Sequence, residues 1–357
     1  MATSASDDPQ VLDGELQEKA TIEAAIDRDP ARSLWRSIVA LVVIGILLGA
    51  IIFAIPGLDG VADALKTAHG GWIAAAIALE VASCLGYVMV FQFVFRRAPM
   101  RFAARLALAE LAFGAAVSLG GAGGIALGAW VLRSRGVPMG KIAERSAVLF
   151  LLTSAVNVVV LAFAGLGVAV GVFDAPGNPL LGWLPFAVGT LVLAFCLVLP
   201  RWARGGANRW GKDTKIGKTL CGTASTLRTT RHLMVQPSWG LLGAYLYLLC
   251  DIGVLWACFE ALGVAPPFFA LVLAYQIGYM ANIVPIPGGL IALDAGLVGM
   301  LVLYGSSATT ATAAVLVYHA IALWIPVLWG TVSFLLLRRS LNEPLVPRTL
   351  PERRRPA

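Results

Sequence analysis

The chain has 357 residues, of which 59% are hydrophobic and only 13% are charged, and its mean hydropathy is +0.82. This apolar share lies far above that of a soluble domain, so the composition excludes an ordinary water-soluble fold and predicts a polytopic membrane protein. The net charge of +7 would suggest nucleic-acid binding in a soluble protein, but in a membrane protein the positions of the charges matter more than their sum.

A polar, acidic segment over residues 1–33 is predicted to be a disordered cytoplasmic tail, and no cleavable signal peptide is expected before the first apolar run. Six apolar runs then reach or approach the roughly 20 residues that a helix needs to cross a hydrocarbon core. Each is predicted to be a full membrane span, and together they cover residues 34–55, 71–95, 146–172, 183–199, 239–262 and 308–337.

Two further apolar runs, residues 102–132 and 268–303, are long but interrupted by glycine or proline. Their topology is inferred from the positions of the basic residues, because short loops rich in Lys and Arg lie on the cytoplasmic side of the membrane. All Lys and Arg residues except Lys66 fall in the N-terminal segment up to Arg36 and in residues 96–105, 133–145, 201–231 and 338–357.

If either interrupted run crossed the membrane once, the basic residues that follow it would face outward. Each run is therefore predicted to be a re-entrant helical hairpin, turning near "SLGGAGG" in the first and "PIPGG" in the second. Both termini, a basic loop over residues 200–238 and a basic tail over residues 338–357 are then cytoplasmic. A turn inside the bilayer needs protein or a wet cavity around it, because lipid cannot satisfy its backbone polar groups.

The two interrupted runs also resemble each other. Residues 109–124 align with residues 274–289 so that both segments end in a glycine pair, and "IALGA" and "IALDA" follow. The predicted fold is therefore an all-α polytopic membrane protein with six full spans and two re-entrant hairpins in an inverted-topology repeat. Repeat one covers about 71–172 and repeat two about 239–337, within one transmembrane domain over 34–337. The alternative is a chance resemblance between apolar segments.

Asp294 is the leading candidate site residue, because it follows Gly289 by about one helical turn, where a helix dipole favours a carboxylate. At the bilayer centre such a group costs about 2.5 to 3.5 kcal/mol to insert, so a cavity or a partner is expected. It either binds a cation, a proton or a headgroup, or only caps the helix. The other candidates near the second hairpin are Gln276, Asn282, Pro287, Gly288, Gly289 and His319. His319 is a candidate partner for Asp294, and the alternative is a structural histidine.

Further polar residues fall inside apolar runs, namely Glu80, Glu110, Asn157 and Asp251. Each is either functional or an interhelical hydrogen-bonding group, and Glu110 is kept as a candidate binding residue. Around the first hairpin the candidates are Gly123, Gly124, Arg133, Arg135, Glu144 and Arg145. Arginine suits a phosphate because its planar fork makes two parallel hydrogen bonds; the alternative is a loop that only sets topology.

Enzyme signatures and metal-ligand spacings are missing from the sequence, so no catalytic residues, no metal site and no cofactor are predicted. The five cysteines show no paired spacing and are interpreted as packing residues. The basic loop, which contains Trp202 and Trp210, is interpreted as a segment held on the anionic inner leaflet. Nucleic acid is not an expected partner.

Two segments resemble a known family, the flippase-like transmembrane region of lysylphosphatidylglycerol synthase and its stand-alone relatives. "PIPGGLIALDAGL" is similar to the family's Pro-Gly-Gly-Leu-Gly-x-x-Glu pattern, with Ile291 in the place of the glycine after the leucine and Asp294 in the place of the glutamate. "LRSRGVPMGKIAER" resembles the segment that follows the family's first hairpin and ends in Glu-Arg, here Glu144 and Arg145. The first hairpin departs from the family pattern because "GGAGG" lacks the proline and the acidic residue. The bifunctional synthases of the family also have a cytosolic aminoacyl-transferase domain, and that domain is not expected in this chain.

The resemblance implies a lipid translocase of the plasma membrane that moves a phospholipid or a polyprenyl-type lipid with a polar or anionic headgroup. Two alternatives stay open. The first is a secondary transporter of a small hydrophilic solute, which would share the architecture. The second is a membrane partner of a lipid-modifying enzyme.

Overall fold

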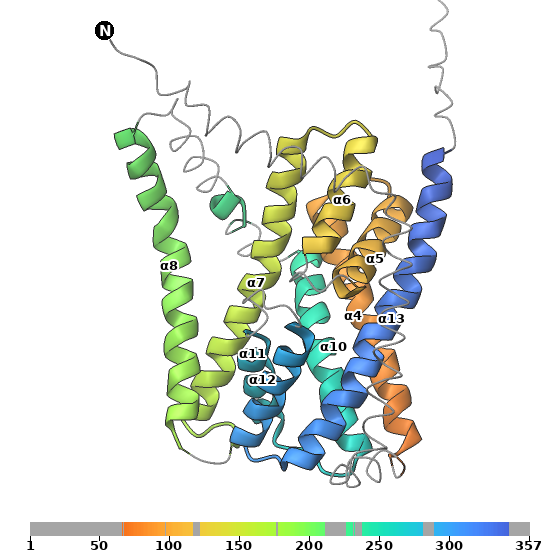
Figure 1. The fold of residues 1–357 in the computed structure, drawn as a ribbon. Coiled ribbons are helices and arrows are strands. Elements are labelled where there is room, and N and C mark those ends of the chain that lie inside the picture. Colours follow the sequence, from red (N-terminus) through yellow and green to blue (C-terminus); the bar gives the residue numbers. More distant parts are fainter. Residues whose placement is uncertain are drawn as a thin grey trace, which may run out of the picture.

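The computed structural model describes residues 66, 68–96, 98–116, 122–175, 178–210, 226–230, 232, 238–280 and 289–342. In these ranges every regular element is a helix (Figure 1). Five helices are long and apolar enough to cross a membrane: α4 (Gly70–Val94), α7 (Met139–Ala169), α8 (Leu180–Trp210), α10 (Trp239–Ala261) and α13 (Ala308–Asn342).

These five helices confirm five of the six predicted long apolar helices, and the sixth, residues 34–55, lies outside the described residues. Several boundaries differ from the prediction: α7 begins at Met139 rather than at residue 146, and α13 ends at Asn342 rather than at residue 337. The largest difference is at the end of α8. The helix predicted over 183–199 continues to Trp210, so the first part of the predicted basic loop is helical. Arginine and alanine favour a helix, and loss of hydropathy marks the end of a span rather than the end of a helix.

Both interrupted runs form pairs of short helices. The first pair is α5 (Met100–Ala116) with α6 (Ala122–Ser134), and the second is α11 (Phe268–Met280) with α12 (Gly289–Leu303). Each of the four has 17 or fewer residues, so each rises by at most about 26 Å, less than the hydrocarbon thickness of about 30 Å. Most of each predicted turn, residues 118–121 and 285–288, lies outside the described residues. The last residues of the two predicted turns are helical, since Gly123 and Gly124 belong to α6 and Gly289 begins α12.

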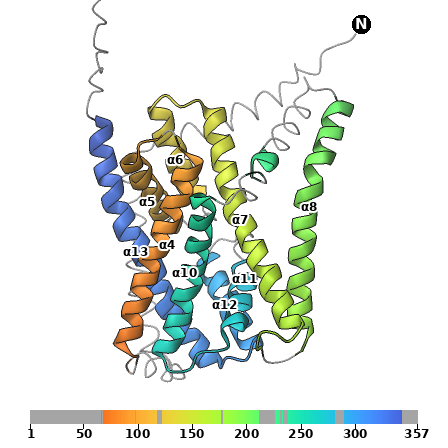
Figure 2. The same ribbon diagram turned by 180° about the vertical axis from the view of Figure 1, so that it is seen from behind.

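The two short pairs lie toward opposite ends of the bundle (Figures 1 and 2). Within each pair the two helices pack against each other. Both pairs end in a glycine with left-handed backbone, Gly136 at φ 79° and Gly305 at φ 100°. A residue with a side chain would be strained there, and glycine lets the chain turn directly into the following long helix.

The centre of the bundle is the contact between α4 and α10, the most extensive between any two described helices. The two run antiparallel, because the His69 backbone N–H before α4 donates to the Ala261 carbonyl at the end of α10 over 2.8 Å. At their crossing a Cβ atom on Gly86 would lie 2.5 Å from the Tyr247 backbone nitrogen. The absence of that atom lets the backbones approach as closely as small residues allow in membrane bundles.

The remaining contacts form corresponding sets in the two halves. The first helix of each short pair packs on a long helix of the other half, α5 on α13 and α11 on α7. The second helix of each pair contacts the long helix that follows it in sequence, α6 with α7 and α12 with α13. Helix α8 lies outside this pattern and packs against α7 at the side of the bundle (Figure 1).

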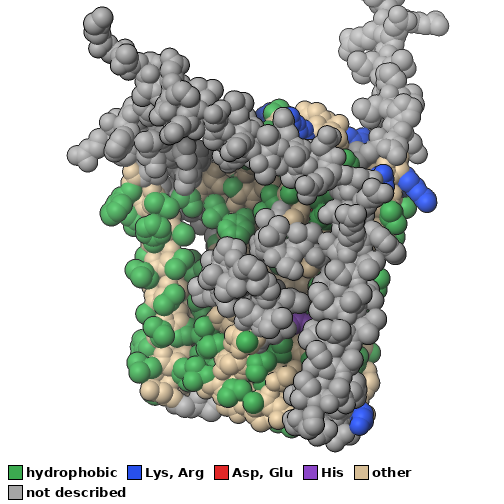
Figure 3. Space-filling model, in the orientation of Figure 1, with side chains coloured by type: hydrophobic (Ala, Val, Ile, Leu, Met, Phe, Trp, Pro, Cys, Tyr) green, Lys and Arg blue, Asp and Glu red, His purple; other side chains and the backbone are tan. Residues whose placement is uncertain are grey.

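Basic side chains of the described residues gather at one end of the bundle (Figure 3). This end contains the C-terminal ends of α4 and α13 and the connection between α6 and α7 (Figure 1). Lys66 precedes α4 and therefore lies at the opposite end. Lys66 and the other described basic residues are thus at opposite ends of the bundle, as their grouping in the sequence predicts. The middle of the bundle contains apolar side chains and a few polar ones.

Candidate functional site

The clearest candidate site is a set of polar side chains buried where α4 and α10 meet their neighbours. Glu80 is 4% exposed, Glu110 is 8% exposed and Gln276 is 4% exposed. Acidic groups are costly inside a membrane protein and are retained when they bind or move something, or when they hold helices together. The acidic side chains of Glu80, Glu110 and Asp251 belong to two clusters, one around Asp251 and one around Glu110.

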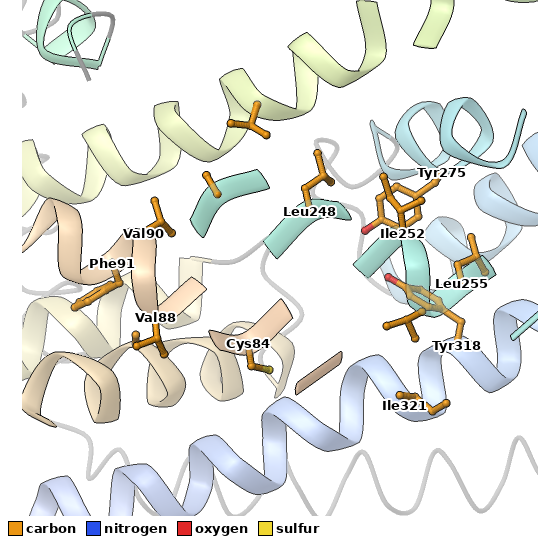
Figure 4. Close-up of a cluster of buried hydrophobic side chains, with 14 of the residues drawn as sticks. Cys84, Val88, Val90, Phe91, Leu248, Ile252, Leu255, Tyr275, Tyr318 and Ile321 are labelled. Atoms are coloured by element: carbon orange, nitrogen blue, oxygen red, sulfur yellow. The ribbon is translucent and has the colours of Figure 1, made fainter. Parts of the chain in front are cut away.

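In the Asp251 cluster, two tyrosines from different helices donate to one carboxylate on α10. The Tyr275 hydroxyl on α11 donates to Asp251 Oδ2, and the Tyr318 hydroxyl on α13 lies 3.2 Å from both carboxylate oxygens. Figure 4 shows the hydroxyl ends of these two tyrosines directed toward each other beside Ile252. Asp251 therefore joins the central helix α10 to the second short pair and to α13.

Glu80 on α4 belongs to the same cluster. It lies at the level of Asp251 in the α4–α10 contact, between the Ser83–Tyr247 hydrogen bond and the contact of Leu79 with Gly253. His319 is joined to the cluster through Tyr318, whose ring centre lies 4.9 Å from its own and whose hydroxyl donates to Asp251. The Cys84 thiol donates to Glu80 Oε1 at 3.7 Å, whereas Glu80 Oε2 is buried and has no hydrogen-bond partner among the described residues. The cluster thus contains two carboxyl groups from the two central helices.

The Glu110 cluster joins α4 to the first short pair. The Tyr87 hydroxyl on α4 donates to Glu110 Oε2 on α5 at 3.3 Å. Two glycines of α6 make room for Glu110. A Cβ atom on Gly124 would lie 2.5 Å from the Glu110 carbonyl oxygen, and one on Gly128 would lie 1.7 Å from Glu110 Oε1.

The two clusters occupy corresponding places in the two halves. Tyr87 and Glu110 are 23 residues apart, and Asp251 and Tyr275 are 24 residues apart. In both, one partner is on the central long helix and the other is on the first helix of the following short pair. Donor and acceptor are exchanged: the short pair carries the carboxylate Glu110 in the first half and the hydroxyl of Tyr275 in the second.

Two of the candidates predicted near the second hairpin lie at or beside the Asp251 cluster. The His319 ring packs 4.9 Å from that of Tyr318, and Gln276 donates to the Asn157 carbonyl of α7 at 3.2 Å. The predicted pairing of His319 with Asp294 stays a prediction. Gly289 and Asp294 lie in α12, but their side-chain surroundings are outside the described part, as are Asn282, Pro287 and Gly288.

The candidates after the first hairpin lie at the basic end of the bundle. Arg133, Arg135, Glu144 and Arg145 are exposed. Arg145 Nη1 donates to the Val94 carbonyl at 3.1 Å, which satisfies a terminal carbonyl of α4. The Arg135 guanidinium lies 5.5 Å from the centre of the Phe102 ring. Gly123 and Gly124 lie in the first turn of α6, where Gly124 is buried against α5.

Sequence reasoning missed the tyrosines. Tyr87, Tyr275 and Tyr318 each sit in an apolar run, where a tyrosine reads as a packing residue. A usable signal was present, because Asp251 and Glu110 lie in apolar runs and each needs a donor from another helix. Which tyrosine supplies that donor depends on helix packing.

Residues 38–330 match the family model described as the lysylphosphatidylglycerol synthase TM region. The match covers most of the chain, including all four short helices and both clusters. No curated protein sequence matches the chain.

Proposed function

Because this chain belongs to the family of lysylphosphatidylglycerol synthase transmembrane regions, we propose that it is a membrane lipid translocase. It moves a lipid with a polar or anionic headgroup between the two leaflets. The observation that carries this proposal is the placement of two short helix pairs toward opposite ends of one apolar bundle, each joined to the central helices by a partly buried tyrosine–carboxylate hydrogen bond.

The proposed topology is an inverted repeat. Helices α4 and α10 run antiparallel at the centre, and the contacts of one half have counterparts in the other. In our proposal the pair α5–α6 enters from the cytoplasmic side and the pair α11–α12 from the outer side, each returning to the side it came from. Inverted repeats of this kind place their substrate sites near the midplane, where interrupted helices end.

The proposed route keeps the acyl chains in the bilayer while the headgroup passes between the two short pairs. Arg133, Arg135 and Arg145 lie at the basic end, where the positive-inside rule places the cytoplasm of the plasma membrane. They would attract an anionic headgroup there. Asp294, near the start of α12, would meet the headgroup close to the interruption of the second pair.

A reconstitution experiment tests the proposal. The purified chain is placed in liposomes that contain one fluorescent lipid with an anionic, zwitterionic or cationic headgroup. A membrane-impermeant quencher then reports how fast the label changes leaflet. We expect the protein to accelerate at least one headgroup class, and Asp294→Ala to slow this movement.

Asp174→Asn is the matched control, because Asp174 is exposed in the connection after α7, and this variant should move lipid at the wild-type rate. Equal rates with and without protein for every headgroup would contradict the proposal. Uptake of a small hydrophilic solute without lipid movement would point instead to a secondary transporter.

A further inference from the structure

The two carboxyl groups of the Asp251 cluster have unequal surroundings. Asp251 accepts hydrogen bonds from Tyr275 and Tyr318 and lies within electrostatic range of His319. Glu80 is 4% exposed, and among the described residues it accepts a hydrogen bond only from the Cys84 thiol, which is a weak donor. Its second oxygen has no hydrogen-bond partner in the described part of the chain.

Glu80 and Asp251 lie at the same level of the antiparallel α4–α10 contact, because Ser83 Oγ donates to the Tyr247 carbonyl on one side of them and a Cβ atom on Gly253 would lie 3.3 Å from Leu79 on the other. Two ionised carboxylates at one level inside an apolar bundle repel each other strongly, because the low dielectric weakens screening. Among the described residues, the titratable groups around the pair are Cys84 on α4, Cys250 on α10, Tyr275 on α11, and Tyr318 and His319 on α13. Of the helices that carry these groups, α4, α10 and α11 contain no Lys or Arg, and those of α13 lie near its C-terminal end. A bound proton is therefore the simplest way to reduce the charge of the pair.

The surroundings also indicate which carboxyl group keeps that proton. Hydroxyl donors stabilise an ionised acceptor, and Asp251 has two of them. Glu80 Oε2 gains no such stabilisation from any residue that the structure describes. A proton on Glu80 leaves Asp251 as the charged acceptor of the two tyrosine hydroxyls.

We propose that Glu80 and Asp251 form a proton-binding pair in which Glu80 keeps a resident proton, Asp251 accepts a second one, and this second proton is the coupling ion of the translocase. This inference rests on the proposed function, which it deepens by naming the ion. It assigns the pair to the contact between α4 and α10, the central helices of the two halves.

Proton binding is coupled to helix movement through the hydrogen bonds that Asp251 accepts. A hydrogen bond to a charged acceptor is roughly twice as strong as one to a neutral acceptor. Protonation of Asp251 therefore weakens its bonds to Tyr275 and Tyr318, which come from α11 and α13. The second short pair is then held less tightly against α10. Release of the proton to water restores the charge and the bonds, so one proton is taken up and one is given back in each cycle.

Infrared difference spectroscopy of the reconstituted full chain tests the site without any transport. A protonated carboxyl group has a carbonyl band that a carboxylate lacks. We expect Glu80→Gln to lose a band present at neutral pH, and Asp251→Asn to lose a band that the wild type gains on acidification. Glu260→Gln, on the same helix as Asp251 but near its C-terminal end, should lose neither. The two substitutions are independent, so either remains informative if the other variant does not fold. Retention of both bands in the folded variants would overturn the proposal.

A second measurement separates this inference from the proposed function. In the liposome assay a pH difference across the membrane should speed lipid movement by the wild type, and Asp251→Asn should lose that response. Lipid movement that ignores the pH difference would overturn the coupling and leave the translocase in place. Loss of the two bands without movement of any lipid would support the proton site and contradict the translocase.

Discussion

The hydroxyl group of Tyr275 on α11 donates a hydrogen bond to the carboxylate of Asp251 on α10. The other half of the molecule repeats this bond in reverse, since Tyr87 on the central helix α4 donates to Glu110 on α5. Each short pair is thus tied to the central long helix of its own half by one tyrosine–carboxylate bond. The bonds are partly buried, and their loss is expected to affect both folding stability and the position of the short pairs.

Removal of either tyrosine hydroxyl at Asp251 should destabilise the protein. Tyr275→Phe and Tyr318→Phe each delete a hydrogen bond to a charged acceptor, and we expect a loss of about 1.5–3 kcal/mol in the free energy of unfolding. Tyr304→Phe deletes a bond to the neutral Leu181 carbonyl at 2.8 Å and should cost about 0.5–1.5 kcal/mol. Denaturant unfolding in detergent measures all three, and equal costs would contradict a charged Asp251.

The contact between Gly128 and Glu110 predicts a strong coupling in a double-mutant cycle. Gly128→Ala puts a Cβ atom where Glu110 Oε1 lies, so the carboxylate must move away from Tyr87. We expect a loss of about 1–3 kcal/mol from this overpacking. In a Glu110→Ala background the same change should cost much less, because the clashing atoms are gone. Additive losses would show that Glu110 does not lie against Gly128.

The α4–α10 crossing predicts a difference between two glycines of one helix. A Cβ atom on Gly86 would lie 2.5 Å from the backbone nitrogen of Tyr247, whereas one on Gly71 would meet nothing within 4 Å. Gly86→Ala should therefore lower the midpoint of thermal unfolding, with a cost of about 1–3 kcal/mol. Gly71→Ala should leave the midpoint unchanged or raise it slightly, because alanine favours a helix. A similar decrease for both would contradict this crossing.

Much of the architecture could be predicted because it depends on local sequence. Run length and hydropathy identified the five long helices that the structure describes, and glycine and proline identified the interruptions between α5 and α6 and between α11 and α12. The end of α8 was predicted less well. Hydropathy falls after Leu199, but the helix continues to Trp210.

The candidate site could be predicted only in part. Glu80 and Asp251 stood out as acidic residues in apolar runs, but their sequence separation gives no sign that α4 and α10 cross beside them. The two tyrosines that bind Asp251 come from α11 and α13, so the cluster exists only once three helices have packed. Asp294 was singled out from local sequence alone, and its role stays a prediction.

The central claim is that each short helix pair returns to the membrane side from which it enters, because a route between opposed hairpins requires this. Ser134, at the end of α6, and Thr309, near the start of α13, are exposed and lie at opposite ends of the bundle. Single cysteines at these two positions, in a chain without its native cysteines, are labelled with an impermeant thiol reagent in intact cells. We predict that Thr309→Cys reacts from outside and that Ser134→Cys reacts only after the membrane is permeabilised. Reaction of both positions from the same side would contradict the account.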